Sequence, residues 1–167
     1  MIDGFLRGLR QPEYVHVLLN PLPVYGLLVS WIALLAALIS KSRRALVVTL
    51  VLVFITSVSA WPVYEFGKQG YDRVLAMTDD DGHAWLDDHE ERADKVIYIF
   101  YALAALSVAG ILVPLRWPKS SALLAISVAL LGAVALGSGV YIAYPGGKVR
   151  HREFRNEPAP PIKSQEG

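Results

Sequence analysis

Four long apolar runs, separated by short charged segments, constrain the fold of this 167-residue chain more than any other feature. They cover residues 15–39, 45–66, 93–115 and 121–144. A helix of about 20 predominantly apolar residues crosses a hydrocarbon core of about 30 Å, and the 54% hydrophobic content exceeds that of ordinary soluble domains. We therefore expect a single all-α domain, a bundle of four transmembrane helices that crosses the cell inner membrane and is surrounded by the lipid bilayer.

The segments between the runs predict the orientation of the bundle. Two short turns contain only basic charges: Lys41, Arg43 and Arg44 in one, Arg116 and Lys119 in the other. Short loops rich in Lys and Arg stay in the cytoplasm. Both termini and the acidic loop 67–92 are then expected on the outer, periplasmic side. Residues 1–14 read as an interfacial segment, and 145–167 as a tail that begins where Pro145 and two glycines stop the last helix.

Two further patterns concern helix shape and packing. Pro21 and Pro23 lie in the first third of the first span, where they are expected to kink or locally open the helix. Small residues recur every four positions in the last span, at Ala125, Ala129, Ala133 and Gly137. Such a stripe lets another helix approach closely, either within the chain, in a membrane protein partner or in a second copy of the chain.

The composition excludes several classes of function. The chain has no cysteine, which removes disulfides, thiolate metal sites and c-type haem attachment. Its net charge of +1 gives no support to nucleic-acid binding. The Asp79–Gly82 cluster does not fit an EF-hand, because Met77 falls at the first ligand position. We find no phosphate loop, no nucleophile elbow and no zinc-binding His-Glu-x-x-His helix, so no motif favours an enzymatic activity, which stays open. The second, third and fourth spans also lack the deeply placed charged residues expected of a transporter.

The four histidines all fall on the outer side in this topology. His16 opens the first span one helical turn before Asn20, His89 precedes the third, and His151 follows the fourth. Neutral imidazoles brought to one level can ligate haem b or a transition metal. The candidate site therefore consists of the cofactor ligands His16, His89 and His151, of Glu90 as a further metal ligand, and of Asn20 and Glu65 as supporting residues.

Each candidate also has a plainer interpretation. His16 can hydrogen-bond Asn20 or a carbonyl freed by the prolines, while His89 and His151 can be solvated surface residues. Two functional hypotheses follow. The first is a membrane subunit with a haem b or transition-metal site facing the periplasm, active in membrane electron transfer. The alternative is a non-catalytic accessory or assembly subunit that packs against a larger membrane complex.

Three motifs together resemble a bacterial family of four-helix integral membrane proteins of unknown function. They are Pro-Glu-Tyr-Val-His-Val-Leu-Leu-Asn-Pro-Leu-Pro at 12–23, Leu-Asp-Asp-His-Glu-Glu at 86–91 and Gly-Gly-Lys-Val-Arg-His at 146–151. The resemblance implies that His16, His89 and His151 are the characteristic histidines. Members joined to Rieske or cytochrome domains associate the family with redox membranes. This chain departs from the pattern at Pro21, where relatives have a second histidine.

Overall fold

The computed structural model describes residues 2–161, and within that range every element is a helix. The elements follow one another as α1 (Ile2–Gly8), α2 (Pro12–Leu19), the π-helical η1 (Leu22–Gly26), α3 (Leu27–Ser40), α4 (Arg43–Val58), α5 (Ala60–Leu75), α6 (Asp80–Arg116), the 3₁₀ turn η2 (Pro118–Ser120), α7 (Ser121–Arg150) and the 3₁₀ turn η3 (Arg152–Phe154). The expectation of an all-α chain is confirmed for this part of the protein.

Four helical stretches are long and apolar enough to cross a membrane: Pro12–Ser40, Arg43–Leu75, Asp80–Arg116 and Pro118–Arg150. They contain the four predicted spans and extend beyond them at the end of the bundle that carries the termini. Most of the expected acidic loop 67–92 is therefore helical. Asp79 explains where α6 begins, because its carboxylate accepts a hydrogen bond from the Gly82 amide at 2.9 Å and caps the helix.

The last helix continues through Pro145, where the sequence predicts its end, and stops only at Arg150. Proline has no amide hydrogen to donate to the carbonyl four residues earlier, which is that of Tyr141. Arg92 of α6 replaces the missing donor at 3.1 Å and also lies over the Tyr141 ring at 4.4 Å. The neighbouring helix therefore compensates for the proline, and α7 keeps its course to the end of the bundle.

The first span is continuous but locally widened at its prolines. Residues Leu22–Gly26 form a π-helical turn, and the Leu27 amide donates to the Leu22 carbonyl, five residues back. A π-turn is a common way to absorb an interrupted hydrogen-bond ladder. The expected opening of the helix at Pro21 and Pro23 is thus observed as a wider turn between α2 and α3.

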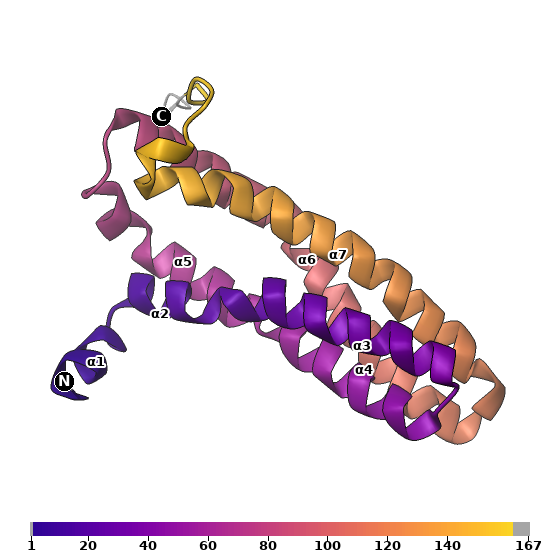
Figure 1. Cartoon of the computed structure of the whole chain (residues 1–167). Helices are drawn as coiled ribbons and strands as arrows, with labels where there is room; N and C mark the ends of the chain where they lie inside the picture. The colour runs from indigo at the N-terminus through magenta and orange to yellow at the C-terminus, as the bar shows by residue number, and fades with distance from the viewer. Residues whose placement is uncertain (1, 162–167) are drawn as a thin grey trace.

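The helices pack tightly at one end of the bundle and separate into two pairs at the other (Figure 1). At the tight end α3, α4, α6 and α7 enclose a core whose fully buried members include Leu27, Leu34, Leu50, Leu103 and Val128. At the other end α2 packs on α5, and α6 packs on α7. The two basic turns lie at the tight end, and α1 and the end of α7 lie at the open end (Figure 1).

The small-residue stripe of α7 packs inside the chain only in part. Ala125 and Ala129 are buried, whereas Ala133 and Gly137 are exposed. Four residues turn an α-helix by about 400°, so a strict four-residue stripe rotates by about 40° at each step and leaves the packed face. The buried seam follows Gly132 and Ala135 instead. A role of the exposed half in binding a partner helix stays a prediction.

Candidate functional site

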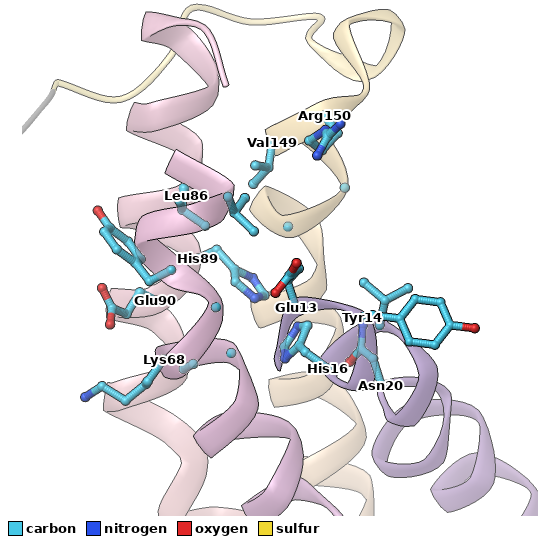
Figure 2. Close-up of a pocket in the computed structure, with 18 of the residues that line it drawn as sticks. Glu13, Tyr14, His16, Asn20, Lys68, Leu86, His89, Glu90, Val149 and Arg150 are labelled. Carbon is cyan, nitrogen blue, oxygen red and sulfur yellow. The ribbon is translucent and has the colours of Figure 1, made fainter. Parts of the chain in front are cut away.

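Two of the four histidines face each other between the separated helix pairs. His16 extends from α2 and His89 from α6, and Figure 2 shows both rings reaching into the same space. Their ring centres are 6.2 Å apart and their planes are nearly perpendicular, at 89°. Residues 73 positions apart in the sequence are thus brought together because α5, on which α2 packs, also contacts α6.

Each ring is oriented by a backbone carbonyl of the neighbouring helix. His16 Nδ1 lies 2.7 Å from the Val63 carbonyl oxygen in α5, and His89 Nδ1 lies 2.8 Å from the Ile142 carbonyl oxygen in α7. A carbonyl oxygen can only accept, so Nδ1 must carry the proton in both rings. In the neutral imidazole this leaves the Nε2 lone pair free to accept a hydrogen bond or bind a metal.

A cavity of about 650 Å³ opens beside the two rings, a size typical of cofactor sites. Its walls come from α2, α5, α6 and α7, and it narrows past the histidines into a small apolar hollow of about 60 Å³ lined by Val24, Ile97 and Phe100. Tyr71, Val74, Leu86 and Val149 line its wider part, and Arg150 and His151 also border it. The cavity surface is mainly apolar, and its polar lining residues include Glu13, Lys68 and Arg150 besides the histidines.

The other predicted site residues lie around this pair. His151 borders the cavity, but its ring is exposed, stacks on Phe154 with centres 4.9 Å apart and hydrogen-bonds Glu153 at 2.9 Å. Asn20 lines the cavity beside His16, and Glu90 lines it beside His89. Glu65 does not line it. Among residues 2–161 no three His, Cys, Asp or Glu side chains are grouped so that they could hold a metal ion.

Sequence reasoning missed Glu13, which lies three residues before His16 and therefore on the same face of α2. One of its carboxylate oxygens is 3.0 Å from Arg73 Nε, and the other is buried without a hydrogen-bond partner. Figure 2 shows this carboxylate among the side chains around the histidine pair. The three-residue spacing from His16 was the signal that could have identified it.

The C-terminal tail folds back over the open end of the bundle. Asp79 pairs with Arg152 and Arg155, each at 2.9 Å, and Arg155 also donates to the carbonyls of Lys148 and Val149 at the end of α7. The hydrogen bond from Arg155 is the main reason that the pKa of Asp79 is lowered to about 2, and the Gly82 amide adds to it. These contacts hold the tail beside the rim of the cavity.

No family model, curated protein or solved structure matches this chain.

Proposed function

We propose that this chain is a multi-pass membrane protein that holds a haem b between His16 and His89 and takes part in membrane electron transfer. The spacing of the two rings is the observation that carries the proposal. A bond from a metal to an imidazole nitrogen is about 2 Å long, and a five-membered ring with bonds of about 1.33 Å has a radius of about 1.1 Å. Two rings on opposite sides of one metal therefore have centres about 6.3 Å apart, against 6.2 Å for His16 and His89.

The protonation of the rings supports the same conclusion. Both Nδ1 atoms donate to carbonyls, so both rings keep Nε2 as the ligating atom. The angle of 89° between the planes is compatible with a shared metal, because each imidazole rotates independently about its own bond to that metal. Helix bundles commonly build cofactor sites from side chains on facing helices.

The number of ligands favours haem over an isolated metal ion. Protein sites for single transition-metal ions usually have three or four side-chain ligands, whereas the described residues bring only two imidazoles together. Two histidines suffice when a porphyrin supplies the remaining four nitrogens. The mainly apolar cavity beside the pair is suited to a flat, largely apolar cofactor.

Haem iron, when bound, supplies reversible one-electron oxidation and reduction. The chain's own residues would bind the cofactor, orient both ligands through the Val63 and Ile142 carbonyls, and limit the access of water by half-burying both rings between helices. If the two basic turns lie in the cytoplasm, as their charges predict, the site lies near the periplasmic face of the inner membrane. The resemblance of the histidine motifs to a redox-associated membrane family supports this assignment by analogy.

The experiment is to purify the protein in detergent after expression with ample haem and to record its absorption spectrum. A low-spin b-type spectrum is expected, and His16→Ala and His89→Ala should each abolish it. His83→Ala and His151→Ala are matched controls that should leave it unchanged, since neither ring belongs to the facing pair. A colourless protein, or equal effects of all four substitutions, would refute the proposal. A stoichiometric transition metal without porphyrin would refute it in favour of a metal site.

A further inference from the structure

Each histidine ring also lies against a glycine of the neighbouring helix. A Cβ atom added at Gly67 in α5 would come within 2.9 Å of His16 Nδ1 and 3.1 Å of its Cε1. A Cβ atom added at Gly146 in α7 would come within 2.8 Å of His89 Nδ1 and 2.9 Å of its Cε1. Contacts this short require a shift, because the interior of a protein is close-packed.

The two sets of contacts have the same construction. In α5, Gly67 comes four residues after Val63, whose carbonyl binds His16. In α7, Gly146 comes four residues after Ile142, whose carbonyl binds His89. In both cases the carbonyl and the glycine lie one turn apart on the same face of one helix. The histidine always comes from the first helix of a hairpin, and its support comes from the second.

We propose that Gly67 and Gly146 are positioning residues, and that the two halves of the chain supply equivalent half-sites. Each half-site consists of one histidine, one backbone carbonyl and one glycine. The proposal rests on the proposed haem function in so far as it assigns these half-sites to the two axial ligands. The glycine allows the ring to lie close to the helix, while the carbonyl sets the direction in which Nε2 points.

A side chain at either glycine would displace its ring in a specific way. The atom that a new methyl group would meet first is Nδ1, the same atom that the carbonyl holds. The ring therefore cannot retreat without lengthening its hydrogen bond. Partners that orient a metal-bound histidine typically change metal affinity by about 10- to 100-fold when they are altered. Each substitution is expected to weaken one ligand and leave the other in place.

Carbon monoxide reports this effect directly, because it binds ferrous haem only where an axial position is open. Reduced Gly67→Ala and Gly146→Ala proteins are expected to bind carbon monoxide about 10- to 100-fold more readily than the unaltered protein. Gly137→Ala in α7 is the control and should bind it no better than the unaltered protein, because nothing lies within 4 Å of a Cβ atom at that position. Equal carbon monoxide binding in all four proteins would overturn the proposal.

A second measurement tests the positioning role even if a variant fails to retain haem. In the protein without haem, thermal unfolding of Gly67→Ala is compared with that of His16→Ala and of the double variant. If Gly67 makes room for the ring, the alanine should destabilise the protein only when His16 is present, and the same holds for Gly146 with His89. Additive effects would refute the positioning role. Coupled effects in a protein that never binds haem would refute the haem function alone.

Discussion

At the scale of single residues, Glu13 places a carboxylate beside the proposed haem site. It lines the cavity, where Arg73 pairs with one of its oxygens and the other oxygen is buried without a hydrogen-bond partner. Replacing it in Glu13→Gln should raise the midpoint potential, because a negative charge stabilises the oxidised, more positive iron. One unit charge acting over about 10 Å at an effective dielectric constant of about 20 contributes at most about 1.7 kcal/mol, or about 70 mV, and the ion pair with Arg73 makes the expected shift smaller.

Potentiometric titration of the detergent-purified protein measures this shift. Glu65→Gln is the matched control, since Glu65 is an acid on α5 that does not line the cavity. Its potential should stay close to that of the unaltered protein. A lower potential in Glu13→Gln, or equal shifts in the two variants, would contradict the assignment of Glu13 to the site.

The candidate site could be predicted from the sequence only in part. Topology alone placed His16 and His89 at one end of the bundle, and the structure brings them together. The same argument included His151, whose ring turns instead to Phe154 and Glu153. Apolar runs determine the level of a residue in a membrane but not the rotation of each helix about its axis. Contacts such as those of Gly67 and Gly146 depend on that rotation, and the sequence pattern does not contain it.

At the scale of the elements, the seam between α3 and α7 depends on Gly132. A Cβ atom there would come within 2.7 Å of Trp31 Cδ1, and Trp31 Nε1 donates to the Ala129 carbonyl at 2.7 Å. Gly132→Ala should therefore lower the free energy of unfolding by about 1–3 kcal/mol, the usual cost of overpacking. Unfolding in mixed micelles measures the change. Gly137→Ala, on the open face of the same helix, should lie close to the unaltered protein, and an equal loss in both would contradict this packing role.

The tail contact made by Asp79 is expected to depend on pH. The pKa of Asp79 is lowered from its ordinary value of 3.8 to about 2 in the folded protein. Its contribution to the attachment of the tail is therefore fully present above about pH 4 and is lost as the pH falls through about 2. Lys148 also lowers the pKa of Glu157 through a hydrogen bond, so that contact weakens in the same direction. The tail should therefore detach from the open end of the bundle in acid.

A spin label tests this detachment, since the chain has no cysteine and Ala159→Cys provides a unique position. Ala159 packs against the buried cluster of Trp85, Leu86 and Val149, so the label should be immobile at pH 6 and mobile at pH 2. Asp79→Asn should make the label more mobile at pH 6 than it is in the unaltered protein, while keeping a residue suited to cap α6. Asp80→Asn is the control and should behave as the unaltered protein. A label that stays immobile in Asp79→Asn would refute the role of this carboxylate.

The elements themselves were partly predictable, for physical reasons that differ along the chain. The four apolar runs are long enough to cross a bilayer, and a helix is the structure in which such a segment can pair all its backbone hydrogen-bonding groups in lipid. All four helices are present. The end of α7 was predicted too early, at Pro145, because a tertiary contact extends the helix. Arg92 carries α7 past Pro145, and the Asp79 cap starts α6 within the segment that composition marks as a loop.

At the scale of the whole molecule, the direction of insertion decides which side of the membrane the site faces. Both basic turns lie at the tight end of the bundle, and α2 lies at the open end (Figure 1). The histidine pair comes from α2 and from the N-terminal part of α6, so it lies towards the open end. Because the short basic turns are expected in the cytoplasm, a cysteine at Asp80→Cys should react with a membrane-impermeant maleimide in cells whose outer membrane alone is permeable. Ser40→Cys should react only after the inner membrane is opened.

The unaltered chain is a control without any background labelling, because it contains no cysteine, and both chosen side chains are exposed. Labelling of Ser40→Cys but not Asp80→Cys in such cells would reverse the orientation and place the histidine pair near the cytoplasmic face. The ring spacing of 6.2 Å and the paired carbonyl contacts would be unchanged by that result.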